Sequence, residues 1–259
     1  MFVRRFRVAS MVAALVISGG IATVSFASDA QEAPRAAKAA QGKIVIIQAV
    51  PKLTLSVTVD GQPVQQGVAE GTILSPLDLA EGSHEVTFSD GQQDVDSTVT
   101  VTAGKSSDVV VHRPAEVGGT PVVSVYPTDE EPIAAGKARV LLAHTATTAP
   151  ADVVVDGQTV FTNIANGEFA QGDLPAGAHQ VSLLPAGVTG KPILGPLDVT
   201  LKAGTITSVY AVGNPKDGSM NVIVRTLGGT ATGGAPPSGV DTGSAGLVGG
   251  VHVWTFSTR

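Results

Sequence analysis

The chain has 259 residues with no cysteine, 31 glycines and 16 prolines, and its formal net charge is −6. The absence of cysteine excludes disulfides, thiolate metal sites and cysteine nucleophiles. A charged fraction of only 15% with so much glycine and proline is typical of a turn-rich fold rather than a helical bundle. An acidic chain is repelled by phosphate backbones, so we expect no nucleic acid partner.

The first 27 residues have the order of a secretory signal peptide: a basic start, an apolar run, and small residues at the two positions that define a cleavage site. This order predicts export by the Sec pathway and a mature chain that begins near Ser28. The apolar run 8–26 is also long enough to span a membrane, so an uncleaved anchor is the alternative. The basic residues are Arg4, Arg5 and Arg7, and the small residues are Ser25 and Ala27.

The rest of the chain contains an internal repeat, because three segments recur in the same order about a hundred residues later. We therefore predict two units, 42–126 and 136–227, joined by a linker at 127–135. Residues 28–41 are predicted to be a flexible lead-in. The recurring segments are 57–62 with 153–158, 79–86 with 174–181, and 99–104 with 199–204.

Each unit has the pattern of short β-strands. Apolar and polar residues alternate over 97–102, as a half-buried antiparallel strand requires. Asp60-Gly61 and Asp156-Gly157 lie between apolar runs and predict tight type I′ hairpin turns. Seven or eight strands per unit indicate a sandwich or barrel. Because each unit has its own strands and turns, we expect two autonomous domains with few contacts between them.

The second unit resembles a known family. It has Ala-Arg-Val-Leu-Leu-Ala-His at 138–144, then Val-Val-Val-Asp-Gly at 153–157, Leu-Pro-Ala-Gly at 174–177 and Leu-Lys-Ala-Gly at 201–204. This order is similar to the secreted bacterial β domain catalogued as domain of unknown function 4397 (DUF4397), over most of 137–227. The unit 42–126 is a divergent copy, because it lacks the His-containing turn and the Pro-Ala-Gly.

The resemblance implies an all-β fold of two tandem immunoglobulin-like or transthyretin-like antiparallel sandwiches. It also implies an extracellular or cell-envelope location in high-GC Gram-positive bacteria. It supplies no catalytic residues. A signal-peptide helix and a Gly-rich tail at 228–250 complete the predicted organisation.

One motif suggests an enzyme. Asp241-Thr242-Gly243 is the loop that aspartic proteases use, in which two facing carboxylates share a proton. Here the motif lies in the Gly-rich tract, and too few residues follow it to build a protease lobe. No second Asp-Thr-Gly occurs in the chain. An extracellular hydrolase with Asp241 is therefore the alternative function, and a linker is the preferred interpretation.

The C-terminal residues 251–259 predict one strand that contains Trp254, the only tryptophan. Such a strand either pairs with an edge of the second unit or adds to the sheet of a partner protein. We prefer pairing within the chain, because an exposed strand promotes aggregation.

The histidines and acidic residues do not have the spacing of a metal site. His84 and His179 occupy equivalent repeat positions after a turn, which favours a structural or surface role. His144 is the turn histidine of the family pattern. The remaining histidines, His112 and His252, are isolated in the sequence. A further group, Asp90, Asp94 and Asp96, crowds one loop; a solvated acidic loop is the preferred interpretation and calcium binding the alternative.

Taken together, these features predict a secreted, cell-envelope-associated, non-enzymatic binding or structural protein. We predict no catalytic, cofactor-binding or metal-binding residues and no cofactor. The expected partner is an unidentified protein or cell-wall component, and the only membrane contact expected is an uncleaved N-terminal segment.

Overall fold

The computed structural model describes residues 39–228, which contain sixteen β-strands and no helix. The first eight strands are β1 (Gln41–Ala49), β2 (Thr54–Val59), β3 (Gln62–Ala69), β4 (Leu77–Ala80), β5 (Gly82–Ser89), β6 (Asp94–Val101), β7 (Ser106–His112) and β8 (Val122–Thr128). The second eight are β9 (Lys137–His144), β10 (Ala151–Val155), β11 (Gln158–Ile164), β12 (Phe169–Pro175), β13 (Gly177–Pro185), β14 (Leu194–Leu201), β15 (Thr205–Val212) and β16 (Asn221–Gly228).

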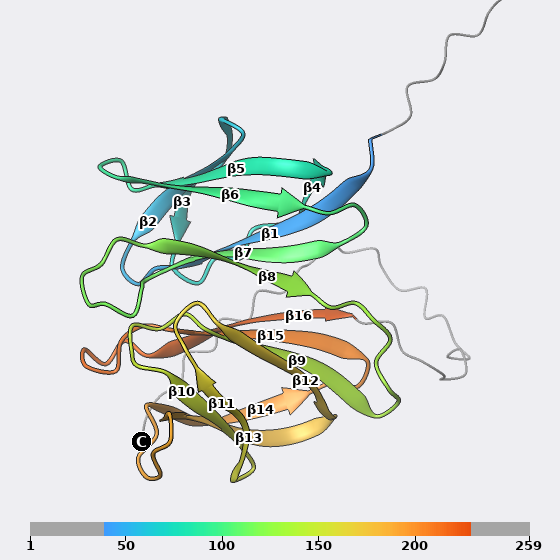
Figure 1. Cartoon of the computed structure of the whole chain (residues 1–259), viewed down its shortest axis with the longest axis vertical. Coiled ribbons are helices and arrows are strands. Elements are labelled where there is room, and N and C mark those ends of the chain that lie inside the picture. The colour runs from blue at the N-terminus through green and yellow to red at the C-terminus, as the bar shows by residue number, and fades with distance from the viewer. Residues whose placement is uncertain (1–38, 229–259) are drawn as a thin grey trace, which may run out of the picture. The chain divides into compact units, whose positions relative to one another are not determined.

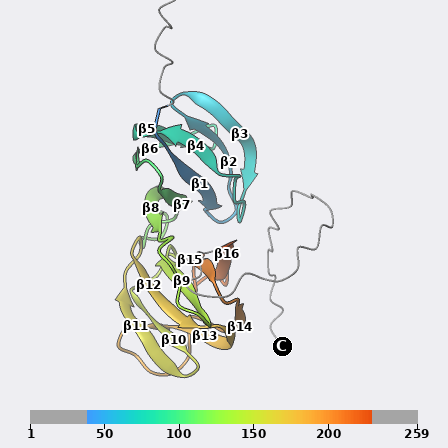
Figure 2. The same ribbon diagram turned by 90° about the vertical axis from the view of Figure 1, so that its right-hand side faces the viewer.

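These strands form four sheets of four strands, two from each repeat (Figures 1 and 2). The first copy contains the sheets β4-β1-β7-β8 and β3-β2-β5-β6, and the second contains β12-β9-β15-β16 and β11-β10-β13-β14. Adding eight to each strand number converts one copy into the other, so both copies have the same topology. The predicted all-β fold with two sandwiches is confirmed. One pair in each copy departs from the antiparallel pattern, because β1 and β7 are parallel, as are β9 and β15.

Both predicted hairpin turns have the conformation that their sequence requires. Asp60 and Gly61 have φ angles of 50° and 71°, and Asp156 and Gly157 have φ angles of 51° and 80°. Two successive positive φ angles define a type I′ turn, which matches the twist of the flanking strands. These turns connect β2 to β3 and β10 to β11, and each of these antiparallel pairs has register shifts farther from the turn.

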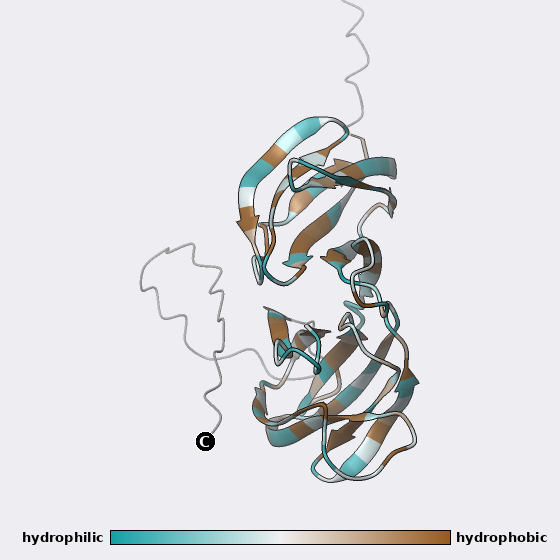
Figure 3. Cartoon of the chain, turned by 90° about the vertical axis from the view of Figure 1, so that its left-hand side faces the viewer, coloured by the Kyte–Doolittle hydropathy of each residue, from teal (hydrophilic) through white to brown (hydrophobic). Residues whose placement is uncertain are grey.

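The strands of the sheets β3-β2-β5-β6 and β11-β10-β13-β14 bury one face and expose the other, as the alternation predicts. Teal and brown residues alternate along them in Figure 3, and β6 has the burial pattern of a half-buried strand. Their inward residues form the core of the first sandwich, in which Phe88, Val86 and Val99 are 0–1% exposed. Val153 and Leu183 have the same place in the second copy.

The central strands of the other two sheets are buried on both faces, and this joins the copies. Their second face forms an apolar cluster to which both repeats contribute. The expectation of few contacts between the units is therefore wrong. It assumed one apolar face per strand, whereas β1 and β9 are buried over most of their length. The cluster comprises Val45, Ile47, Ala49, Val110 and Tyr126 from the first copy, and Leu141, Ala143, Tyr210, Val212 and Ile223 from the second.

The predicted linker is also more ordered than expected. Its first two residues, Pro127 and Thr128, extend β8, and Ile133 is fully buried. The domain bounds themselves remain predictions. Between residues 39 and 228 there is no helix long and apolar enough to cross a membrane. The predicted signal peptide, Asp241, His252 and the strand 251–259 lie outside the described residues.

Candidate functional site

Each repeat contains the same histidine–aspartate pair at its hairpin turn. The Nδ1 atom of His84 lies 2.7 Å from Oδ2 of Asp60, and its Nε2 atom lies 2.8 Å from the carbonyl oxygen of Ala80. In the second copy His179 makes the same two contacts with Asp156 and Pro175, at 2.7 and 2.8 Å. The equivalence predicted from the repeat is thus present in the contacts.

These pairs fasten the turn to the neighbouring strand. The other carboxylate oxygen of Asp60 accepts a hydrogen bond from the backbone N–H of Glu85, and that of Asp156 accepts one from Gln180. Each histidine therefore links a type I′ turn, the start of the next strand and the end of the preceding one. This is a structural role, in agreement with the interpretation made from the sequence.

The surroundings also fix the charge of both histidines. A carboxylate and a carbonyl oxygen can only accept, so these contacts favour the form in which both ring nitrogens carry hydrogen, which is the imidazolium. The hydrogen bond to Asp60 raises the pKa of His84, and the bond to Asp156 raises the pKa of His179. A general base needs a free ring nitrogen, and neither histidine has one.

These contacts predict a pH window for stability. Because the pKa of His84 is raised above its ordinary value of 6.5, its contribution is complete below that value and is lost as pH rises through the folded-state pKa. The pKa of Asp60 is lowered, chiefly by the bond to His84, so its contribution is lost only in acid. Proton NMR titration of both histidine rings should therefore give pKa values above 6.5.

The repeat supplies a matched control for this titration. Replacing Asp60→Asn keeps a residue suited to the turn but removes the charge, so the pKa of His84 should fall while that of His179 stays raised. If His84 titrates at or below 6.5 in the unmodified chain, the assigned imidazolium pair is wrong.

A buried charged cluster connects the two copies. Asp108 of β7 is 1% exposed and accepts a hydrogen bond from the hydroxyl of Tyr210 at 2.5 Å. Nη1 of Arg225 on β16 lies 3.1 Å from Oδ1 of Asp108, although that oxygen receives no well-aligned hydrogen bond. Burial raises the pKa of Asp108, and Arg225 opposes the shift. The cluster lies between sheets, where a substrate has no access.

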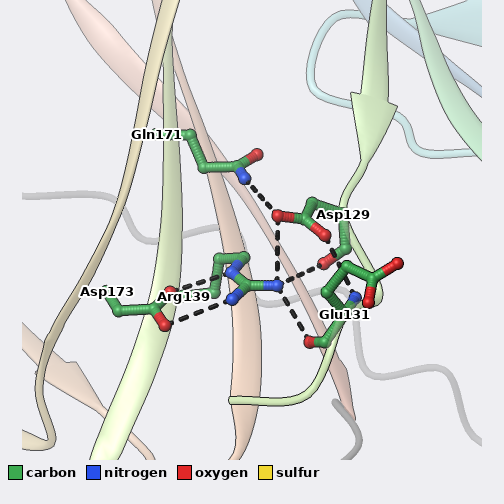
Figure 4. Close-up of polar contacts among 5 residues, drawn as sticks. All are labelled: Asp129, Glu131, Arg139, Gln171 and Asp173. Atoms are coloured by element: carbon green, nitrogen blue, oxygen red, sulfur yellow. Dashed lines mark hydrogen bonds and ion pairs between the residues drawn. The ribbon is translucent and has the colours of Figure 1, made fainter. Parts of the chain in front are cut away.

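A second arginine anchors the segment between the repeats (Figure 4). Arg139 of β9 binds the carboxylate of Asp173 through Nε at 2.8 Å and Nη2 at 3.2 Å. Its Nη1 lies 3.1 Å from Oδ2 of Asp129 and donates to the carbonyl oxygen of Glu131 at 2.9 Å. Gln171 completes the group by donating to Asp129 at 2.7 Å. The predicted linker is thereby held against the second sandwich.

The turn histidine of the family pattern is buried and bonded to its own loop. His144 is 0% exposed, and its Nε2 atom lies 3.2 Å from the carbonyl oxygen of Ala149. Its counterpart in the first copy is Gln48, whose side chain bonds Val50 and Leu53 in the same kind of loop. The sequence comparison missed Gln48, although its position at the end of an apolar run that matches 139–144 identifies it.

The structure brings His112 close to His144, although the two are far apart in the sequence. His112 is fully buried, and its ring nitrogens contact the carbonyl oxygen of Arg113 and the hydroxyl of Ser124. Burial lowers the pKa of His112, and His144 lowers it further. Two neutral buried rings at this position fit a packing role.

The acidic loop of the first copy bonds mainly to itself and to its neighbours. Oδ1 of Asp90 accepts the backbone N–H groups of Gln92 and Gln93, and Asp96 accepts the hydroxyl of Thr87. Within the described part of the chain, no three histidine or acidic side chains are grouped as a metal ion would need.

An apolar cavity of about 560 Å³ lies between the two sheets of the second sandwich. All eight strands of that copy contribute to its walls. The aliphatic residues Leu142, Val153 and Leu183 line it, as does Phe161. Polar lining residues include His179, Asp198, Thr200 and Thr226, of which the last three are exposed.

The fold and these sites define the protein as a tandem β-sandwich with internally bonded polar clusters and an apolar cavity in the second sandwich. Residues 42–151 match the family model described as "Domain of unknown function (DUF4397)", so the predicted resemblance to this family is confirmed over these residues. The matched residues contain the whole first sandwich and β9. The resemblance was expected to be clearest in 137–227, so its placement differs from the prediction.

Comparison with solved structures gives matches of low similarity to this chain. Among eleven matching chains is the crystal structure of a protein from Bacteroides eggerthii DSM 20697, described as a "putative cell adhesion protein". The identity is 10%, the TM-score is 0.20, and the match covers 74% of this chain and 97% of that one. No curated protein matches the chain.

Proposed function

We propose that this chain is an exported, cell-envelope-associated binding protein without enzymatic activity. The observation that carries the proposal is the cavity in the second sandwich, whose lining is mostly apolar, while the histidine–aspartate pair beside it is engaged in structural bonds. Binding pockets are commonly apolar with a few polar groups at the edge. A catalytic site instead needs a titratable group that is free to act on a substrate.

The sequence supports the location. The order of charges and apolar residues in 1–27 is that of an export signal. We expect the chain recovered from the producing bacterium to fractionate with the envelope or the medium and to begin near Ser28. N-terminal sequencing of the recovered chain tests this. A chain that retains Met1 in the cytoplasmic fraction would contradict export, and a membrane-bound chain with Met1 would identify an anchor.

The absence of enzymatic activity is tested by screening the exported chain against peptide, ester and glycoside substrates. No turnover above that of the heat-unfolded chain is expected. Turnover that Asp241→Asn abolishes would overturn the proposal in favour of a hydrolase. Co-sedimentation of the folded chain with washed envelopes tests binding, and recovery of the chain only in the supernatant would contradict it.

A further inference from the structure

The two copies share a topology, but they differ in how closely one edge of the sandwich approaches the facing sheet. In the first copy this edge is closed. Strand β6 approaches β1, β7 and β8 of the facing sheet. The equivalent strand β14 makes no approach of that extent to β9, β15 or β16. The pairing of β13 with β14 also contains an irregularity between Val181 and Leu183, whereas β5 pairs with β6 continuously. Such a bulge bends the strand and redirects it.

Valines at equivalent positions of the two copies differ in their exposure. Val109 in β7 and Val209 in β15 occupy equivalent positions. Val109 pairs with Ile46 and Val125, and Val209 pairs with the equivalent residues Leu142 and Val224. Val109 is 0% exposed, whereas Val209 is partly exposed and lines the cavity. Val99 and Val199 are also equivalent, because they pair with His84 and His179. Val99 is 0% exposed, whereas Val199 is partly exposed. The same residue types therefore close one sandwich and line an open cavity in the other.

The cavity has the dimensions of a slot for an elongated molecule. On β14 its lining extends over residues 197–201, which is roughly 14 Å at about 3.4 Å per residue. Close-packed interiors contain few voids larger than a water molecule, so 560 Å³ between two sheets is far more than imperfect packing leaves. Most of the lining is Val and Leu, which offer no hydrogen bonds. Such walls favour an apolar occupant, and branched Val and Leu side chains pack well against an aliphatic chain.

The polar residues at the edge of the slot determine which charge the head group of the occupant can have. Thr200 and Thr226 are exposed there and have hydroxyl groups, while Asp198 has a carboxylate. His179 lies 2.7 Å from Asp156, whose carboxylate balances the charge of the ring when the ring is protonated. The remaining charge at the edge is negative, so an anionic head group is repelled and a hydroxyl group fits.

We propose that the second sandwich binds one long-chain aliphatic molecule with an uncharged hydroxyl head group, with its chain between the two sheets. This inference rests on the proposed binding function and specifies its ligand. In the first sandwich the equivalent valines, Val99 and Val109, are fully buried in the core.

The test uses the full mature chain and the neutral apolar fluorophore N-phenyl-1-naphthylamine, which brightens on transfer from water to an apolar site. One fluorophore should bind per chain, and 1-decanol should displace it. Decanoate should compete at least tenfold more weakly at neutral pH, and Asp198→Asn should reduce that difference. Equal competition by the alcohol and the carboxylate would overturn the head-group assignment.

Two variants at repeat-equivalent strands locate the site. Val209→Phe places a ring in the cavity and should abolish fluorophore binding. Val125→Phe, on the exposed edge of β8 at the position equivalent to Val224, should leave binding unchanged. Circular dichroism checks that both variants fold. Binding that survives Val209→Phe in a folded chain would overturn the inference.

Two other outcomes would also overturn it. One is no saturable binding to the unmodified chain. The other is binding only after residues 229–259 are removed, because the chain would then supply its own occupant. If envelope co-sedimentation persists while fluorophore and decanol binding fail, the ligand assignment is wrong but the proposed binding function stands.

Discussion

Replacing Arg225→Ala should lower the free energy of unfolding by about 3–5 kcal/mol, because it leaves a buried carboxylate without its cation. Asp108 would keep the hydroxyl of Tyr210 and the side chain of Ser208 as partners on the facing copy, but no cation. Denaturant unfolding followed by circular dichroism measures the loss. Because burial already raises the pKa of Asp108, the loss should shrink as pH falls and the carboxyl group becomes neutral.

The double variant Asp108→Asn with Arg225→Met is the control for this prediction. It removes both charges, so it should be more stable than Arg225→Ala alone, because no unpaired charge remains buried. A loss below about 1 kcal/mol for Arg225→Ala, in the range of an exposed ion pair, would show that the two copies do not pack over this cluster.

Replacing Val109→Phe should destabilise the chain by about 1–3 kcal/mol, whereas Val209→Phe should cost much less. The added ring has no space beside Val109, which is 0% exposed in a closed core. Beside Val209 it enters the cavity instead. Thermal unfolding of both variants measures the difference. Equal losses would contradict the distinction between a closed and an open sandwich.

The turns and the repeat could be predicted from the sequence because they depend on local residue types. Asp-Gly between apolar runs requires two positive φ angles, and few other dipeptides adopt them without strain. The equivalence of His84 and His179 followed from the same comparison, since each histidine follows a recurring turn. The contacts of these residues lie within one hairpin and its neighbouring strands.

The joining of the two copies was missed because alternation was taken as the only pattern of a strand. Residues 44–47 and 140–143 are continuous apolar runs, which is typical of strands buried on both faces. The cluster around Asp108 also needs three strands from two copies. No spacing along the chain indicates that those side chains meet.

The cavity could not be predicted, because the residues that line it also fill the closed core. Val99 and Val199 are the same residue on equivalent strands, as are Val109 and Val209. Their exposure differs only because the two sheets approach in the first copy and separate in the second. That separation depends on tertiary packing and on the bulge beside β14.

Titration of the ¹⁵N-labelled mature chain with 1-decanol, followed by amide chemical shifts, tests most directly whether the second sandwich is a binding site. Saturable shifts should be confined to strands that line the cavity, with the largest on β14, β15 and β16. The amides of β2, β5 and β6 in the closed first sandwich should not move. Shifts in both copies alike, or no saturable shift in β14 to β16, would contradict a site between the sheets of the second sandwich.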